Sequence, residues 1–149
     1  MGMEKIGTPD DLSAILGMAD GQFGRIVVMA YQGNAESRYR ELSAREAREF
    51  IRTENPLILD VRTKGEYDTG YIKGAKLIPV QELASRIGEI QEYKDKDVFI
   101  YCRSGNRSTV AAEILSRAGF RKLHNLRHGI LEWERAEYPV EAPDRTVSN

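Results

Sequence analysis

An apolar segment, Val98–Tyr101, leads into a polar loop and then into a helical pattern, and this succession constrains the fold more than any other feature of the chain. The β-branched and aromatic residues of this segment predict a buried strand. The stretch Thr109–Ala118 has the composition of a helix, and Gly119 is placed to end it. In open α/β sheets ligands bind beyond the carboxyl ends of such strands. The intervening loop is therefore the first place to look for a functional site.

The rest of the chain repeats this alternation of strands and helices. Further strands are predicted at Leu57–Leu59 and Leu123–Asn125. One helix is expected after a capping box at Ser43–Glu46, a second over Gln81–Tyr93 and a third over Gly129–Ala136. Apolar strands that alternate with helices predict an α/β fold, with a parallel sheet covered by helices on both faces.

Composition excludes several classes of function. The net charge is −1 although 30% of the residues are charged, so no general affinity for nucleic acid or for an anionic membrane is expected. No apolar run approaches the roughly 18 residues of a membrane helix, and the polar N-terminus does not resemble a signal peptide. A single cysteine cannot form an internal disulfide, which favours a reducing compartment. We therefore expect a cytoplasmic protein, whose oligomeric state the sequence does not predict.

Cys102 lies where the predicted strand ends and the polar loop begins. A lone cysteine is more often a small buried apolar residue than a nucleophile. Here, however, the neighbours are glycine, asparagine, serine and two arginines, which do not suit a core. The main-chain N–H groups and the positive end of the following helix dipole stabilise an anion at this position. We predict that Cys102 is a reactive thiolate.

The loop Cys102–Ser108 resembles the active-site loop of the rhodanese family, in its single-domain sulfurtransferase form. Two further blocks agree with this resemblance: Leu59–Pro79, with its Asp-Val-Arg and Gly-Tyr-Ile-Lys-Gly-Ala segments, and Leu126–Val140. The three blocks occur in the order of the family. Tyr71 and His128 depart from it, because members commonly have histidine and glycine at these places.

The resemblance also suggests how the chain is divided. Residues 39–141 correspond to a rhodanese-like domain, preceded by an N-terminal extension at residues 1–38 and followed by a tail at residues 142–149. The extension is expected to hold a short helix that begins at Thr8–Asp11 and a strand at Arg25–Tyr31. It is too short for a domain of its own, and we expect it to pack on the main domain or to mediate pairing between chains.

The resemblance implies a covalent sulfur transfer. Cys102 would take the outer sulfur of a small donor such as thiosulfate, form a persulfide, and pass that sulfur to cyanide or to a thiol such as thioredoxin or glutathione. Two half-reactions and ping-pong kinetics are expected. No cofactor is implied. A metal site is not supported either, since one cysteine and two histidines at these spacings match no zinc pattern.

The loop itself supplies the groups that such chemistry needs. Its consecutive main-chain N–H groups can form an anion-binding nest, and Gly105 allows a turn with positive φ. The hydroxyls of Ser104 and Ser108 add donors. Arg103 is expected at the mouth, where it would hold the oxyanions of a donor, while Arg107 either does the same or turns back to fix the loop. The predicted loop or substrate-binding residues are Arg103, Ser104, Gly105, Asn106, Arg107 and Ser108.

Asp60 and Arg62 follow the strand at Leu57–Leu59, so both are expected near the carboxyl edge of the sheet. Support of the loop is the favoured role, and contact with substrate is the alternative. His124 and His128 are the only candidates for a base that would pair with Cys102. Their distance from it in the sequence favours ordinary structural or surface histidines.

Two alternatives to a catalytic sulfurtransferase are compatible with this fold. A phosphatase or arsenate reductase of the same fold needs five residues between the cysteine and the arginine, whereas four residues separate Cys102 from Arg107. This shorter loop favours one sulfur atom over a tetrahedral oxyanion. A persulfide carrier or regulatory module needs the same loop as the enzyme, so the sequence does not separate carrier from catalyst.

Overall fold

The computed structural model describes residues 38–143. The predicted helix and strand of the extension, and nearly all of the C-terminal tail, lie outside the described residues. Within them, five parallel strands form one sheet in the order β1-β5-β4-β2-β3. The strands are β1 (Arg40–Leu42), β2 (Leu57–Asp60), β3 (Lys76–Leu77), β4 (Asp97–Tyr101) and β5 (Lys122–Leu126).

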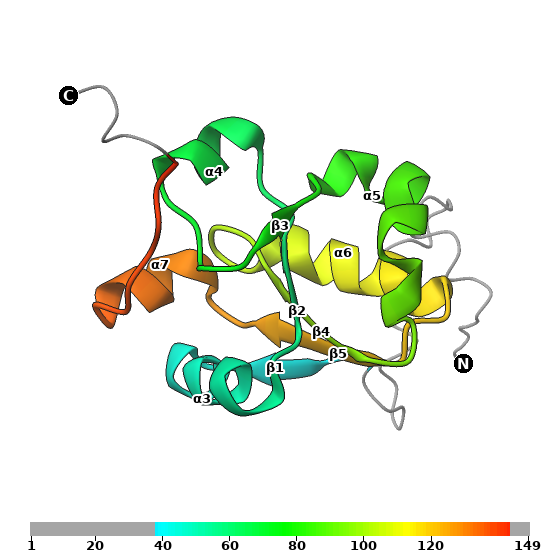
Figure 1. The fold of residues 1–149 in the computed structure, drawn as a ribbon, viewed down its shortest axis with the longest axis horizontal. Coiled ribbons are helices and arrows are strands. Elements are labelled where there is room, and N and C mark those ends of the chain that lie inside the picture. Colours follow the sequence, from blue (N-terminus) through cyan, green and yellow to red (C-terminus); the bar gives the residue numbers. More distant parts are fainter. Residues whose placement is uncertain (1–37, 144–149) are drawn as a thin grey trace, which may run out of the picture. The chain divides into compact units, whose positions relative to one another are not determined.

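Helices follow the strands along the chain (Figure 1). They are α3 (Ala44–Glu54), α4 (Lys64–Thr69), α5 (Val80–Arg86), the 3-10 helix η1 (Ile87–Tyr93), α6 (Asn106–Arg117) and α7 (Gly129–Arg135). The predicted α/β class with a parallel sheet is therefore confirmed. Because β4 lies between β2 and β5, Cys102 follows the central strand of the sheet.

The side chains of β4 divide the core between the two faces of the sheet. Val98 and Ile100 point into a cluster with the buried residues of α5 and α6, and Cys102 extends this alternation by one residue. Phe99 and Tyr101 point into a second cluster that includes residues of α3 and α7. This period of two is the geometry of a strand buried on both faces, and it fixes the face on which the sulfur emerges.

Capping boxes begin the helix that precedes β2 in the chain and the helix that follows it. At α3, the Ser43 hydroxyl accepts from the Glu46 N–H at 3.1 Å and the Ser43 N–H donates to the Glu46 carboxylate at 2.8 Å. Thr63 and Glu66 repeat this arrangement at α4. The first box was predicted from its sequence pattern. The second has the same Thr-x-x-Glu pattern, and it places a carboxylate near the Cys102 loop.

Several short helices and strands were either not predicted from the sequence or predicted with the wrong extent. Strands β1 and β3 contain three and two residues, and helix α4 contains six, so none offers a periodic pattern to read. The single helix predicted over Gln81–Tyr93 is in fact two, since α5 gives way to η1 and Ile90 has a non-helical φ of −125°. Leu83 and Ile90 are nevertheless both buried.

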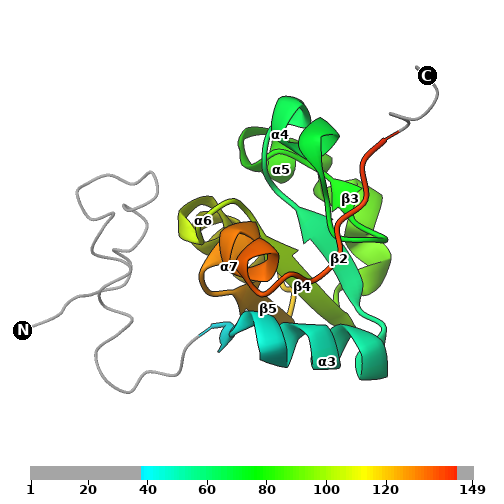
Figure 2. The same ribbon diagram turned by 90° about the vertical axis from the view of Figure 1, so that its left-hand side faces the viewer.

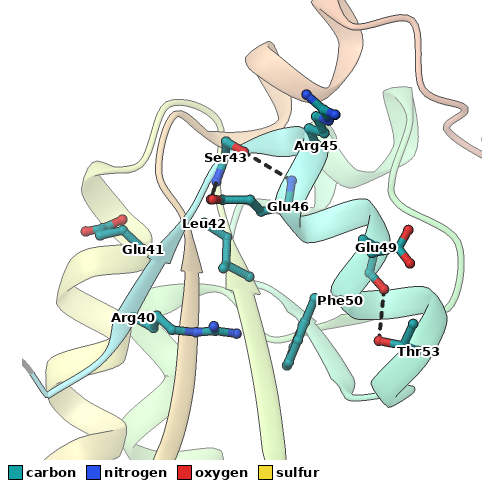
Figure 3. Close-up of a pocket in the computed structure, with 9 residues that line it drawn as sticks. All are labelled: Arg40, Glu41, Leu42, Ser43, Arg45, Glu46, Glu49, Phe50 and Thr53. Carbon is teal, nitrogen blue, oxygen red and sulfur yellow. Dashed lines mark hydrogen bonds between the residues drawn. The ribbon is translucent and has the colours of Figure 1, made fainter.

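A hollow of about 960 Å³ opens between β1 and α3 (Figure 3). Arg40, Leu42 and Phe50 face one another there, and the capping box at Ser43–Glu46 lies at one end. All of its lining residues belong to β1, α3 and the link between them, so this hollow is separate from the cysteine loop.

His124 links β5 to the edge strand β1 beside this hollow. Its Nδ1 accepts a hydrogen bond from Arg40 Nε at 3.2 Å, so the neutral ring carries its proton on Nε2 and donates to Asp97 at 2.9 Å. The ring also packs on Phe50, with 4.3 Å between centroids. Burial lowers the pKa of His124 below its usual 6.5, and the charge of Arg40 adds to this effect against the opposing influence of Asp97.

This arrangement predicts a pH-dependent stability. A histidine whose pKa is lower in the folded state than in the unfolded state binds its proton first in the unfolded chain, so stability is lost as the pH falls below about 6.5. Urea unfolding at pH 8 and pH 5 should show a larger loss for the wild type than for His124→Gln. Equal losses in the two proteins would show that His124 does not contribute.

Candidate active site

Cys102 follows the last residue of β4, and its sulfur faces main-chain donors of the loop that it opens. Sγ accepts hydrogen bonds from the N–H of Gly105 at 3.1 Å and from the N–H of Ser108 at 3.3 Å. The Ser108 hydroxyl lies 3.4 Å from the same sulfur and donates to the Gly105 carbonyl at 3.2 Å. Only 1% of Cys102 is exposed. The sulfur is therefore enclosed in a small polar cradle at the N-terminus of the 12-residue helix α6.

The loop keeps this shape because a second turn packs against its back. The Ile130 N–H donates to the Cys102 carbonyl at 2.9 Å, and the Leu131 N–H donates to the Arg103 carbonyl at 3.2 Å. In both ribbon views α7 lies beside the loop that precedes α6 (Figures 1 and 2). These two hydrogen bonds attach the first residues of the cysteine loop to the start of α7.

Two glycines permit this close approach. Gly105 has a φ of +107°, and a Cβ on it would lie 2.2 Å from the carbonyl oxygen of Arg127. Gly129 has a φ of +67°, and a Cβ there would lie 2.1 Å from the carbonyl oxygen of Arg103. A side chain at either position would meet rigid backbone while adopting a strained conformation. The sequence predicted the turn at Gly105 but gave no indication of the contact across to the second turn.

Arg107, near the start of α6, pairs with Glu66 of α4. Its two terminal nitrogens lie 2.8 and 2.9 Å from the two carboxylate oxygens. The hydrogen bonds of Arg107, together with those of Thr63 and against the effect of burial, lower the pKa of Glu66 to about 2. The pair joins Arg107 to α4, and both roles that the sequence left open for this arginine stay predictions. Glu66 was not singled out as a site residue, although its capping-box pattern is visible in the sequence.

Asp60 and Arg62 form a buried ion pair below α4. Arg62 Nε lies 2.9 Å from one carboxylate oxygen of Asp60, and an Arg62 terminal nitrogen lies 2.6 Å from the other. Arg62 also donates to the Gly70 carbonyl at 2.8 Å. Burial is the largest single effect and acts to lower the pKa of Arg62, but the hydrogen bonds and the charge of Asp60, with smaller effects from Tyr101 and Glu66, together raise the pKa. Through Gly70 the pair is bonded to the C-terminal end of α4, the helix that carries Glu66, and the supporting role stays a prediction.

The other loop residues project to the surface. Arg103, Ser104 and Asn106 are exposed, and none of their side chains has a hydrogen bond or ion pair within residues 38–143. Their roles in binding a donor stay predictions. His124 is engaged by Arg40 and Asp97, and His128 accepts from Arg127, so neither histidine bonds to Cys102.

In the described part of the chain, no three histidine, cysteine or acidic residues gather as metal ligands would. Between residues 38 and 143, no helix combines the length and apolar character that crossing a bilayer requires.

The close backbone contact at Gly105 predicts that a side chain at this position destabilises the protein. Gly105→Ala should lower the free energy of unfolding by about 1–3 kcal/mol, the usual cost of a strained backbone conformation, and the distorted loop should lose reactivity at Cys102. Gly88→Ala is the matched control, because nothing lies within 4 Å of a Cβ at that position. Equal unfolding midpoints for the two variants would contradict the argument.

The Glu66–Arg107 pair predicts acid sensitivity. Because the pKa of Glu66 is about 2 when folded against an ordinary 4.5, the stabilisation is present above pH 4.5 and is lost as the pH falls toward 2. Glu66→Gln should reduce the difference in unfolding free energy between pH 6 and pH 3. Glu49→Gln, which removes an exposed pair with Arg52 three residues away, should change it far less.

Comparison with known proteins places this geometry in a family. The family model described as a Rhodanese-like domain matches residues 43–136. A protein named Sulfurtransferase from Allochromatium vinosum is 42% identical over 92 residues, which cover 62% of this chain and 84% of the relative.

Solved structures agree with the sequence comparison. The rhodanese-related protein of Thermoplasma volcanium has a TM-score of 0.63 and 33% identity, covering 69% of this chain and 98% of that one. A thiosulfate sulfurtransferase from Pseudomonas aeruginosa has a TM-score of 0.62 and 30% identity, covering 70% of this chain but only 20% of that larger protein. This chain therefore belongs to the rhodanese-like domain family.

Proposed function

We propose that this protein is a sulfurtransferase that moves a sulfane sulfur from a donor such as thiosulfate to a thiophilic acceptor through a persulfide on Cys102. Family membership and a relative named Sulfurtransferase support sulfur transfer as the general chemistry. The observation that carries the finer proposal is the pair of main-chain N–H groups, from Gly105 and Ser108, directed at Sγ. Such donors stabilise an anionic sulfur without a metal or a basic side chain.

The first half-reaction loads the cysteine. The Cys102 thiolate attacks the outer sulfur of thiosulfate, a new S–S bond forms, and sulfite leaves with the electron pair of the bond that breaks. The charge is conserved, since a thiolate and a dianion give an anionic persulfide and a sulfite dianion. In this proposal loop N–H groups also hold the terminal sulfur, and exposed Arg103 attracts the dianion.

The second half-reaction releases the sulfur. The acceptor attacks the terminal sulfur of the persulfide, and the electron pair of the broken S–S bond returns to Sγ as a thiolate. Cyanide would leave as thiocyanate, whereas a thiol such as thioredoxin or glutathione would leave as its own persulfide. We propose that this cycle takes place in the cytoplasm, because the lone cysteine must stay reduced between turnovers.

The loop geometry argues against phosphate chemistry. Arg107, the arginine expected to face a bound oxyanion, is occupied by Glu66 in a two-point ion pair. Only 1% of Cys102 is exposed. A tetrahedral phosphate would require both the loop and this ion pair to open.

The burial of the sulfur also favours a second candidate, a persulfide carrier that turns over slowly with small donors. A carrier would hold the same persulfide in the same cradle. Turnover separates the two functions, because an enzyme cycles repeatedly with thiosulfate and cyanide whereas a carrier is loaded once and waits for its partner.

Intact-mass measurement after incubation with thiosulfate tests this function. The wild type should gain one sulfur, about 32 Da, and should lose it when cyanide is added. Cys102→Ser should gain nothing. The absence of any gain on a wild-type thiol that still reacts with an alkylating agent would rule out thiosulfate as donor, and hydrolysis of a phosphate ester would then be the next assay.

A further inference from the structure

Among the arginines near Cys102 in the described residues, some form ion pairs with carboxylates and others do not. Arg62 is paired with Asp60, and Arg107 is paired with Glu66. Arg103 and Arg127 are both exposed, and neither has an ion pair with any residue of the described range 38–143. Two cationic side chains are therefore available to a ligand.

Arg127 belongs to the turn between β5 and α7 that packs against the cysteine loop. Its carbonyl oxygen lies 2.2 Å from where a Cβ on Gly105 would be, so the two chain segments touch at the centre of the loop. His128, the next residue, is exposed and accepts a hydrogen bond from Arg127 Nε at 3.3 Å. Its Nε2 therefore carries a lone pair, and the neutral ring restrains the arginine. We call Arg103, Arg127 and His128 the basic rim.

Nearby acids do not cancel this charge. Arg127 contributes to lowering the pKa of Glu46, after the larger effects of Ser43, but the Glu46 carboxylate is bonded to Ser43. Glu132 on α7 has one carboxylate oxygen buried without a hydrogen-bond partner, and it pairs with neither arginine. The chain as a whole carries a charge of −1, so the positive charge at the rim is a local feature.

We propose that the basic rim docks the sulfur acceptor, and that this acceptor is a polypeptide whose cysteine is flanked by acidic residues. The inference rests on the proposed function, since it concerns the partner of the same persulfide. One arginine would satisfy the single charge of a small acceptor such as cyanide. Arg103 and Arg127 belong to separate segments, and carboxylates on several residues around a cysteine would match both.

The transfer step is a thiolate attack on the persulfide. The cysteine thiolate of the docked polypeptide forms a bond to the terminal sulfur, the bond between that sulfur and Cys102 Sγ breaks, and its electron pair stays on Sγ. The polypeptide leaves as a persulfide and Cys102 returns to a thiolate. Docked carboxylates would raise the local concentration of the attacking thiol without taking part in the bond changes.

Three synthetic peptides test the proposal, each with one cysteine flanked by glutamates, by glutamines or by lysines. Cys102 is first loaded with thiosulfate and checked by intact mass, excess donor is removed, and the rate of sulfur transfer to each peptide is then measured. At low salt the glutamate peptide should react about tenfold faster than the glutamine peptide and the lysine peptide more slowly than both, and 0.5 M salt should reduce these differences.

The ratio of the glutamate rate to the glutamine rate is the decisive readout in variants. Arg127→Gln should lower this ratio about threefold, and His128→Gly should lower it as well by releasing the arginine. Arg135→Gln, which removes an exposed arginine at the far end of α7, should keep the wild-type ratio. Because the ratio compares two acceptors on the same loaded protein, altered loading does not affect it.

Failure of the proposal is distinguishable from failure of the proposed function. If Cys102 gains no sulfur in the loading step, the proposed function is wrong. If loading succeeds but the three peptides react at equal rates, or if Arg135→Gln lowers the ratio as much as Arg127→Gln, the basic rim does not dock the acceptor.

Discussion

Main-chain hydrogen bonds between the cysteine loop and the start of α7 determine the chemistry of this protein. The carbonyls of Cys102 and Arg103 are bonded to N–H groups of α7, and farther along the same loop the N–H groups of Gly105 and Ser108 donate to the sulfur. Both partners must come close for this to happen, and Gly105 and Gly129 make it possible. The anion-binding cradle is therefore a product of two turns that follow neighbouring parallel strands.

Two ion pairs link the elements around this cradle to one another. The buried pair of Asp60 and Arg62 holds α4, and the Glu66 carboxylate of α4 holds Arg107 at the start of α6. Arg62 and Arg107 are each balanced by a carboxylate, whereas exposed Arg103 and Arg127 have no ion pair within residues 38–143. The sulfur is thus held by neutral peptide dipoles, while full charges remain for molecules that approach from solvent.

The sequence predicted those parts of the site that depend on local pattern. The strand before Cys102, the helix after it and the positive φ at Gly105 each follow from a few neighbouring residues. The ion pair between Glu66 and Arg107 spans 41 positions, and the contact between Gly105 and Arg127 depends on two turns meeting in space. Such long-range contacts leave no periodic signal in the sequence.

A crystal structure of the protein soaked in thiosulfate would show whether the loop N–H groups hold a persulfide on Cys102. We expect one additional sulfur bonded to Sγ, within hydrogen-bonding distance of loop N–H groups, with the Glu66–Arg107 pair intact. An unmodified Sγ with thiosulfate bound intact, or an opened loop with Arg107 turned onto the oxyanion, would contradict the account.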